Sequence, residues 1–554
     1  MQNKTKKLFT LLSCLAVHLF LQNQIYPQNS LEDFLKSLNQ APAEPLENQK
    51  ELTVILSSFS LNLNPHTSVY SNEAQILNST YEGLFSYNSQ TAEPDFALAV
   101  NYTTSRDQLL WTFTLRDDAF FSDGKKITST DVKESWLNLL ATPGAYYSSF
   151  LDIIKGAEEY RLKKGSRNNV AIIANDDYTL SIELKSPVSY LPKLLCHHSL
   201  AVVSKNSTCY SGPYTISAVK KDRLILEKNK YYYDESNVKI PKITILFSDD
   251  IDENSYQFNI GNVQWVNANC NVKSILQKDA IRIDAVFGTY FFFFKLGNSP
   301  YLTEKVRASL LEAVPWEALR EGSLFPATTF IYPIAGYQSP SALAYTNYEH
   351  SKLLMEEAKK ELKLSASDTI ELTFAIPSGD SIYAAAKILQ KSWEKIGIKL
   401  NIKQIPDTLY LNNISKTKAD LFVYTWIGDF CDPVAFLELF RSDSTLNESK
   451  WKNKEFDSLL DKANSTLNET ERLDILSQAE DLLLTNSVVI PLTHSIDINI
   501  INSNEISGWS ANPLNIHPFK NMFFIKPVQS NPSQIIAMKN HIKNSTALIE
   551  KRLK

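Results

Sequence analysis

Asp429 is the residue whose surroundings most favour ligand chemistry in this sequence. It follows Leu421–Trp426, an apolar and aromatic run long enough for one buried strand, and Gly428 breaks that run. A carboxylate beside Trp426 and Phe430 loses much of its hydration, so it requires a cation or several hydrogen-bond donors. Asp429 is therefore either a binding group for a positively charged ligand or an aspartate that caps the following helix.

Patterns typical of enzymes are incomplete in this chain. The sequence contains no P-loop, HExxH, GxSxG or dinucleotide motif. Gly379-Asp380-Ser381 resembles the nucleophile block of GDS-type esterases, but the downstream Asp-x-x-His that such an enzyme needs is absent. An enzyme is thus the less favoured class, and we expect no catalytic residue and no cofactor.

Histidine and cysteine spacings predict no metal site. Adjacent residues of a strand point to opposite faces, so His197 and His198 make a poor joint metal site, and we expect them to face solvent or a core edge. The cysteines beyond residue 21 match no zinc or CxxC spacing, and a disulfide among them stays open for an exported protein. They are Cys196, Cys209, Cys270 and Cys431.

Composition excludes several other function classes. The chain has 554 residues, a net charge of −5 and a sequence pI near 6.0, so neither nucleic acid nor an anionic membrane is expected as a partner. Only 15 glycines occur, which argues against a glycine-rich phosphate loop. The 28 Phe, 25 Tyr and 8 Trp supply apolar surface for cores and for a ligand cleft. The length predicts two or three lobes.

The first residues indicate export. A basic start precedes the apolar stretch Leu8–Leu21, which is too short to span a bilayer as a typical helix, so residues 1–21 are interpreted as a signal segment. Leu11-Leu12-Ser13-Cys14 resembles a lipoprotein cleavage box that would place a lipid on Cys14. Cleavage after Leu21 and an uncleaved anchor are the alternatives. We expect a periplasmic protein, free or membrane-attached through this segment.

Apolar periodicity predicts the elements that position Asp429. Residues 22–50 form a polar linker and residues 527–554 a polar tail. Strands are expected at residues 52–56, 109–116, 180–184, 214–216, 224–226, 243–247, 290–294, 372–374 and 398–402. Helices are expected at residues 73–81, 128–139, 354–362, 382–396, 456–463 and 472–484. Strand and helix alternation in the last third predicts an α/β lobe with a largely parallel sheet.

Four stretches in order carry a family resemblance. They are Glu93–Arg116 with Phe121–Gly124 and Thr128–Trp136, Ser211–Ile216 with Leu226–Tyr231, Val306–Leu310, and Trp426–Asp429 with Asp432-Pro433. On these residues the chain resembles the bacterial extracellular solute-binding proteins of the peptide/nickel class, above all the periplasmic oligopeptide-binding proteins of ABC transporters. The resemblance runs roughly from residue 51 to residue 526.

The resemblance implies an α/β fold of periplasmic-binding-protein type. Two hinged α/β lobes enclose a ligand cleft, and a smaller third lobe is added. Lobe I would comprise residues 51–82, 176–287 and 497–526, the third lobe residues 83–175, and lobe II residues 288–496. In this family, hinge closure traps a peptide that is held largely through its backbone.

The implied function is the capture of oligopeptides for transmembrane transport. The protein would be a monomeric solute-binding component that delivers peptides to the ABC permease subunits in the inner membrane. Asp429 matches the carboxylate that holds the peptide α-ammonium group. Tyr147 and Trp426 match aromatic residues that line the cleft, and Val69 matches a backbone contact in lobe I. Thr425 and Ile427, the neighbours of Trp426, are also expected to contact the ligand.

Departures from the family pattern leave the ligand less defined than the fold. The basic positions that neutralise the peptide carboxylate align with Asn298, Ile382 and Val423, none of which is charged. Lys295 or Arg282 would have to supply a substitute cation. A binder of a muropeptide, glutathione, a metal chelate or haem on the same fold is the alternative. The disulfide of the oligopeptide-binding relative aligns with Gly288 and Ile427, so this chain lacks it.

Overall fold

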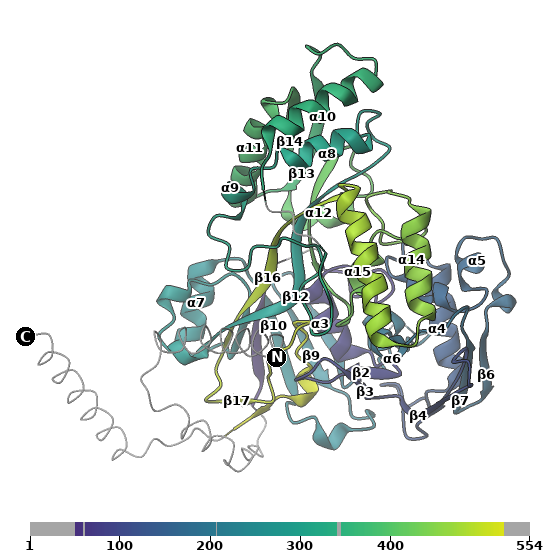
Figure 1. Ribbon diagram of the computed structural model, residues 1–554. Helices are drawn as coiled ribbons and strands as arrows, with labels where there is room; N and C mark the ends of the chain where they lie inside the picture. The colour runs from purple at the N-terminus through teal and green to yellow at the C-terminus, as the bar shows by residue number, and fades with distance from the viewer. Residues whose placement is uncertain (1–49, 59–60, 207, 341–344, 526–554) are drawn as a thin grey trace, which may run out of the picture. The chain divides into compact units, whose positions relative to one another are not determined.

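The computed structural model describes residues 50–58, 61–206, 208–340 and 345–525 (Figure 1). All the helices and strands named below lie in one compact unit, Asn48–Phe524. The predicted signal segment, the lipid site at Cys14 and the tail at 527–554 lie outside the described residues. Within the described part of the chain, no helix is both long and apolar enough to cross a bilayer.

A mixed ten-stranded sheet is the framework of this unit. Its strand order is β14-β13-β15-β12-β16-β11-β1-β10-β9-β8. The strands are β1 Leu52–Leu56, β8 Tyr214–Val219, β9 Arg223–Lys228, β10 Lys242–Phe247, β11 Trp265–Asn267, β12 Ile281–Phe294, β13 Ile370–Pro377, β14 Ile398–Ile405, β15 Leu421–Ile427 and β16 Val489–Ile501. The strands expected from periodicity at these places are confirmed.

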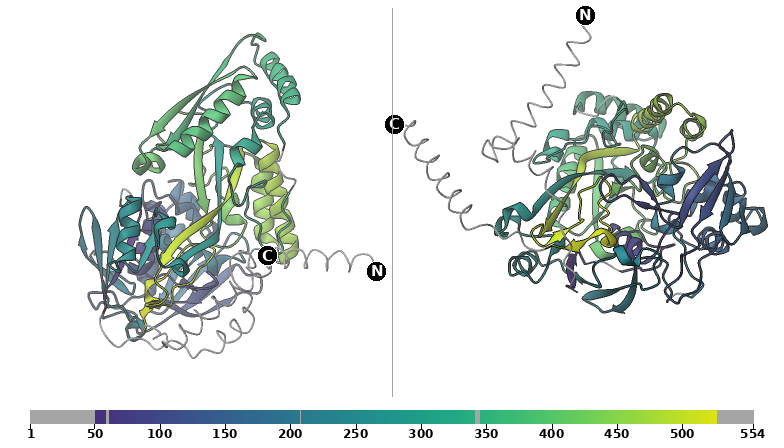
Figure 2. Two further views of the ribbon diagram at one scale, coloured as in Figure 1. Left: turned by 90° about the vertical axis from the view of Figure 1, so that its left-hand side faces the viewer. Right: turned by 90° about the horizontal axis from the view of Figure 1, so that it is seen from below.

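Two long strands, β12 and β16, join the halves of this sheet. They pair antiparallel from Ile281 opposite Ile500 to Phe293 opposite Val489, and they run side by side in Figure 2. The register of this pairing shifts between Ala285 and Thr289, and again between Tyr290 and Phe291. Both lobe boundaries expected between lobes I and II fall inside this two-stranded ribbon. Its irregular stretch is therefore the candidate hinge.

The two halves of the sheet differ from the predicted parallel arrangement. Strands β13, β14 and β15 are parallel, as expected, but β12 and β16 add antiparallel neighbours beside β15. The prediction of a largely parallel sheet is wrong because these two strands return from the other half. There, β1 pairs in parallel with β10 and β11, and the β8–β9 hairpin extends the edge.

A separate four-stranded sheet, in the order β4-β5-β7-β6, lies in the region of the expected third lobe. Its strands are β4 Ala99–Thr104, β5 Leu110–Leu115, β6 Ile172–Asp176 and β7 Thr179–Glu183. The expected boundary at residue 175 assigns β7 to lobe I, whereas its hydrogen bonds are with β5 and β6. Helix α4, Ser129–Ala141, confirms the helix expected at 128–139 and begins with a capping box of Thr128 and Asp131.

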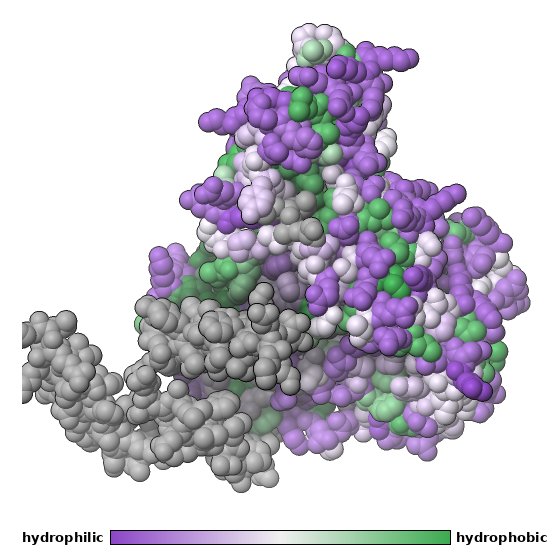
Figure 3. All heavy atoms as spheres, in the orientation of Figure 1, coloured by the Kyte–Doolittle hydropathy of each residue, from purple (hydrophilic) through white to green (hydrophobic). Residues whose placement is uncertain are grey.

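Helices and minor strands complete the unit. The remaining α-helices are α3 Ser71–Thr80, α5 Ala157–Arg161, α6 Leu191–Leu194, α7 Ile251–Asn259, α8 Glu304–Glu312, α9 Trp316–Arg320, α10 Tyr348–Glu361, α11 Asp380–Glu394, α12 Asp407–Asn413, α13 Val434–Leu437, α14 Lys454–Ser465 and α15 Glu469–Thr485. The short strands are β2 Phe85–Tyr87, β3 Pro94–Phe96, β17 Ile506–Ser507 and β18 Phe523–Phe524. Ser351, Met355 and Ala358 are buried on α10, whereas the side seen in Figure 3 is mainly hydrophilic.

The aromatic run in β12 is buried on both faces. Phe291, Phe292, Phe293 and Phe294 are each at most 3% exposed, because helices and loops cover both sides of the sheet here. Phe292 packs on Phe374 of the neighbouring parallel strands. This run belongs to the core of the half that carries β15 and hence Asp429.

Candidate functional site

Asp429 occupies a turn that is tied to two other parts of the fold. The N–H of Gly428 donates to the Phe287 carbonyl at 2.8 Å, at the irregular part of β12. A Cβ at residue 428 would lie 2.6 Å from Phe287 Cδ1, so only glycine permits this approach. On the other side, the Tyr87 hydroxyl from β2 donates to the Asp429 carbonyl at 3.0 Å. The turn thus contacts both β12 and the region of the expected third lobe.

The Asp429 carboxylate is buried and incompletely satisfied. Its side chain is 9% exposed, and Oδ1 lies 3.3 Å from His197 Nε2. Among the described residues, Oδ2 has no hydrogen-bond partner. Burial raises the pKa of Asp429 well above its usual value. A ligand cation at Oδ2 would supply the missing interaction.

The capping role considered for Asp429 is filled by another residue. Asp432 Oδ1 accepts the Val434 N–H at 3.0 Å at the start of α13. Its Oδ2 pairs with the guanidinium of Arg472 on α15. Asp432 therefore fixes the end of the turn, and the Asp429 side chain is not used for this cap.

His197 and His198 are buried, so the expected solvent or edge position is wrong. Each is 4% exposed, because the chain here forms the 3-10 helix His198–Leu200, with His197 as its cap, rather than a strand. The helical turn directs His197 to Asp429 and His198 to the Ser68 hydroxyl, 2.7 Å from its Nε2. An apolar run before this pair, Leu194–Cys196, was the sequence signal for burial.

His197 is held as a neutral ring whose Nε2 faces Asp429. The Ser199 backbone N–H donates to His197 Nδ1 at 3.3 Å, so the proton of the neutral ring resides on Nε2. That nitrogen is the one that faces Asp429 Oδ1. Burial lowers the pKa of His197 to about 3. His197 therefore supplies a hydrogen-bond donor and no positive charge.

Aromatic rings from distant segments surround this pair. The Tyr147 ring centroid lies 4.3 Å from that of His197, and the Phe150 ring 5.4 Å from it. Tyr424 and Trp426 of β15 stack at 6.0 Å, and the Tyr424 hydroxyl bonds that of Tyr146. These rings lower the local dielectric constant, which strengthens any charge pairing at Asp429.

The other predicted contact residues differ in which of their groups remain available to a ligand. The Trp426 indole N–H donates to the Ala435 carbonyl at 2.9 Å, so its ring face is what is left for a ligand. The Val69 N–H donates to buried Glu73 at 2.8 Å, which leaves its carbonyl as the backbone group for a ligand. On β15, Thr425 is exposed and Ile427 half-buried. Their roles in binding remain predictions.

The two candidate substitute cations are engaged elsewhere. Lys295 Nζ donates to the carbonyls of Ile414 at 2.7 Å and Ser415 at 3.0 Å. Arg282 donates to the Asp279 carbonyl at 2.6 Å and contacts Ser503 Oγ at 3.4 Å. Both are committed to local structure.

The uncharged residues at the aligned basic positions serve the fold. Asn298 Nδ2 donates to the Ala419 carbonyl at 2.6 Å, and the Val423 N–H donates to the Tyr410 hydroxyl at 2.9 Å. Ile382 lies half-buried on α11. None of the three supplies a charge for a ligand carboxylate.

Gly288 and Ile427 are register partners in β12 and β15, where the relative's disulfide aligns. Cys196, Cys209, Cys270 and Cys431 are all unpaired, so the disulfide left open among them does not form. In the described ranges, no three His, Cys, Asp or Glu side chains are grouped to hold a metal ion. Asp380 and Ser381 of the esterase-like block are exposed at the start of α11.

Glu448 is a buried acid beside β15 that sequence reasoning did not single out. Its Oε2 is buried, with no hydrogen-bond partner in the described part of the chain, and burial raises its pKa. It lines a small cavity of about 10 Å³ with Tyr424, Phe291 and Phe293. A lone acid in a polar loop carries no sequence signal, because the contact arises only when the loop folds onto β15.

Comparisons with known proteins agree with this architecture. Residues 93–448 match the profile of the bacterial extracellular solute-binding proteins, family 5, middle region. The dipeptide-binding protein DppE of Bacillus subtilis is 26% identical over 469 residues, covering 79% of this chain and 86% of that protein.

Two solved structures share the fold. The murein tripeptide binding protein MppA of Escherichia coli has a TM-score of 0.77 at 22% identity, covering 87% of this chain and 100% of that one. The substrate-binding domain of the oligopeptide ABC transporter of Bacillus anthracis has a TM-score of 0.75 at 22% identity, with the same coverages.

Proposed function

The chain belongs to family 5 of the bacterial extracellular solute-binding proteins, and from that membership we propose that it is the peptide-binding component of an ABC importer. The observation that carries this proposal is the buried Oδ2 of Asp429, which lies beside a neutral histidine and has no partner among the residues that the structure describes. This arrangement complements a single ammonium group. The peptide α-ammonium would bind there, with Tyr147, Trp426 and the Val69 carbonyl lining the cleft.

The setting of the protein follows from the same proposal. It works outside the cytoplasm, as a monomer in the periplasm, and hands peptides to permease subunits in the inner membrane. Lobes I and II hinge at β12 and β16, and the third lobe carries Tyr147. Relatives whose names state a dipeptide, a murein tripeptide or an oligopeptide are all similar to this chain, so the fold supports peptides as the class.

Native mass spectrometry of the purified protein tests the proposed ligand class. Peptides of several residues should co-purify in the cleft and should be released by unfolding. Recovery of only a non-peptide ligand, such as a metal chelate or haem, would contradict the proposal. A muropeptide would be recognised by its sugar and D-amino-acid masses.

Amidation of the peptide C-terminus is expected to change affinity by less than about 1 kcal/mol, the scale of an exposed ion pair. No charge is present at Asn298, Ile382 or Val423, and Lys295 is held by backbone carbonyls. A peptide carboxylate should therefore reach solvent. Calorimetry with matched free and amidated peptides measures the difference. A large loss that Lys295→Ala reproduces would show that Lys295 binds the carboxylate.

Peptide binding is expected to reduce the radius of gyration. Opening at β12 and β16 would separate Asp429 from Tyr87 and His197 in the empty protein, and a bound peptide would hold these segments together. Small-angle scattering with and without saturating peptide measures the change. The N-acetylated peptide is the control, because it lacks the cation that Asp429 needs. An unchanged radius at proven saturation counts against hinge closure.

A further inference from the structure

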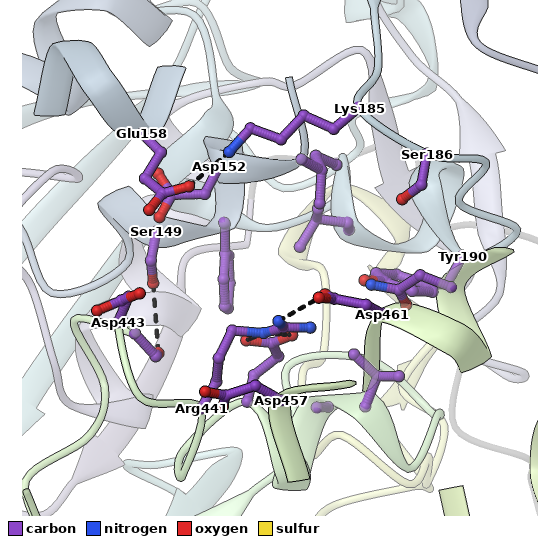
Figure 4. A pocket seen from close by; sticks show the side chains of 18 of the residues that line it. Ser149, Asp152, Glu158, Lys185, Ser186, Tyr190, Arg441, Asp443, Asp457 and Asp461 are labelled. Carbon is purple, nitrogen blue, oxygen red and sulfur yellow. Dashed lines mark hydrogen bonds and ion pairs between the residues drawn. The ribbon is translucent and has the colours of Figure 1, made fainter. Parts of the chain in front are cut away.

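A cavity lies beside the aromatic residues next to Asp429. It has a volume of about 520 Å³ and is shown in Figure 4. Phe150, whose ring packs on His197, and Phe430, which follows Asp429, form part of its wall. The volume lies in the range of small-molecule sites. The proposed peptide contacts do not use this cavity.

The cavity lies between two segments that are distant in sequence. One wall runs from Ser149 to Leu194 and the other from Phe430 to Ser465. At the rim, Ser149 Oγ lies 2.9 Å from Thr445 Oγ1. Arg161 donates to the Asp443 carbonyl at 3.1 Å. The two walls are thus held together, and a ligand inside would contact both.

Carboxylates from both walls face this cavity and outnumber the cations. Lys185 and Arg441 are the two basic residues that line it. The acidic residues that line it are Asp152, Glu158, Glu438, Asp443, Asp457 and Asp461. A single positive charge added here would reduce the repulsion among them.

Most of these carboxylates already have cationic partners. Asp152 pairs with Arg161, and Glu158 with Lys185. Arg441 alone serves two acids, Glu438 at 2.9 Å and Asp461 at 2.8 Å. Its guanidinium charge is therefore more than neutralised, which leaves the cavity negative overall.

Two carboxylates remain without a cation. Asp457 Oδ1 accepts only the Ser442 backbone N–H at 3.0 Å, and no ion pair to Asp457 or Asp443 occurs in the part of the chain that the structure describes. Asp457 is half-buried, so part of its carboxylate is accessible to a ligand cation.

Asn464 is an independent sign of a ligand. It lines the cavity and is only 8% exposed. Its Oδ1 is a buried acceptor with no hydrogen-bond partner within the described ranges. Such an orphaned acceptor is costly unless a donor arrives. Acceptors at Asn464 and Asp457, with no grouped metal ligands among the described residues, favour an N–H donor over a metal ion.

The other residues that line the cavity indicate what kind of molecule carries this N–H donor. Apolar and aromatic side chains make up much of it: Phe150, Ile153, Tyr190, Leu194, Phe430 and Val434. Tyr190 and Phe430 stack with centroids 5.3 Å apart and planes at 9°. An apolar body with a cationic end fits such a lining, whereas a small inorganic cation leaves the apolar wall unused.

We propose that this cavity binds an organic cation, an alkylammonium or guanidinium group on an apolar chain, with Asp457 and Asn464 as its acceptors. Two sources share this chemistry: a free amine, and a basic side chain of a peptide whose ammonium end lies at Asp429. The site is separate from Asp429, so the free-amine form does not depend on the proposed peptide function. Charges on both walls make the bound cation a bridge between the segments.

Calorimetry distinguishes the two sources. One arm titrates cadaverine and agmatine into the full protein, with 1-pentanol as the uncharged control. The other compares a peptide containing arginine with the same peptide containing norleucine. Saturable binding of an amine, or tighter binding of the arginine peptide, supports the site. If no amine binds and the two peptides bind equally well, the proposed site is overturned.

Variants assign the effect to the cavity. Asp457→Asn keeps the acceptor for the Ser442 N–H but removes the charge, and it should weaken cation binding about tenfold to a hundredfold. Asn464→Leu should weaken it without changing the net charge. Glu371→Gln, which removes an exposed carboxylate paired with Lys399, is the control and should change nothing.

Equal effects of Asp457→Asn and Glu371→Gln would show a general charge effect and overturn the assignment. Asp429→Asn separates the two functions: it should abolish binding of the norleucine peptide and leave cadaverine binding intact. If no peptide binds but cadaverine does, the proposed function fails and the cation site stands. Circular dichroism of each variant verifies folding.

Discussion

Asp429→Asn should weaken binding of a free peptide by about 3–5 kcal/mol, the cost of removing one side of a buried charge pair. The neutral amide cannot compensate an ammonium group in a site where His197 is also neutral and aromatic rings exclude water. Isothermal calorimetry with one peptide, free and N-acetylated, measures the loss. Wild-type protein should discriminate between the two peptides by a similar amount, and the variant should not.

Asp420→Asn is the matched control for this experiment. Asp420 is also a buried aspartate with a raised pKa, but its Oδ2 accepts the Thr373 N–H at 2.8 Å and so already has a partner. This variant should retain the preference for the free peptide. Equal affinity of wild-type protein for free and acetylated peptides would remove Asp429 from the anchor role.

The same Asp429→Asn substitution should raise the melting temperature of the empty protein. Burial raises the folded pKa of Asp429 above its unfolded value of about 3.9. Its contribution to stability is therefore present below the unfolded pKa and lost as pH rises through the folded pKa. The variant has a neutral amide at this position and carries no such loss, so the gain in Tm should grow with pH across that window. A Tm for the variant below wild type throughout it would contradict this account.

Proton release is expected when a peptide binds at Asp429. The empty site favours the protonated carboxyl, and an ammonium ion at Oδ2 favours the ionised form. Affinity should therefore rise with pH until the empty site is ionised. Calorimetry in phosphate and in Tris measures the released protons from the difference in heat. The Asp429→Asn variant should show no such difference if its residual binding is measurable.

Arg472→Met should lower the free energy of unfolding by about 3–5 kcal/mol, the second large effect we expect. The Arg472 side chain is 1% exposed, and its guanidinium pairs with Asp432 Oδ2. Removing it leaves the Asp432 carboxylate buried, where burial already raises its pKa. Thermal unfolding of the variant against wild type, both without peptide, measures the loss.

A double variant shows whether the pair or the charge left behind is responsible. Adding Asp432→Leu to Arg472→Met removes both buried charges and should restore part of the stability. It would still lack the cap on Val434 that Asp432 provides, so peptide affinity should stay reduced. Lys399→Met at an exposed pair is the control and should change Tm little. An Arg472→Met protein as stable as wild type would show that the pair contributes nothing.

Local elements were predictable because their causes are local. The capping box at Thr128, the β8–β9 hairpin and strand β15 each follow from residues within one turn or one strand. The turn at Asp429 was also readable, because Gly428 and Asp432-Pro433 interrupt an apolar run. The antiparallel direction of β12 and β16 could not be predicted, because hydrophobic periodicity identifies a strand but not its partner in the sheet.

By itself, the sequence determined the α/β character, the position of Asp429 between a strand and a helix, and the absence of charge at three aligned basic positions. Only the tertiary structure decided what meets Asp429. His197 reaches it from a segment far away in the chain, with Tyr147 packed on that histidine. Asp432, not Asp429, accepts the N–H at the start of α13. Burial and pairing are properties of contacts between distant segments, and those contacts set the charge state on which binding at this site depends.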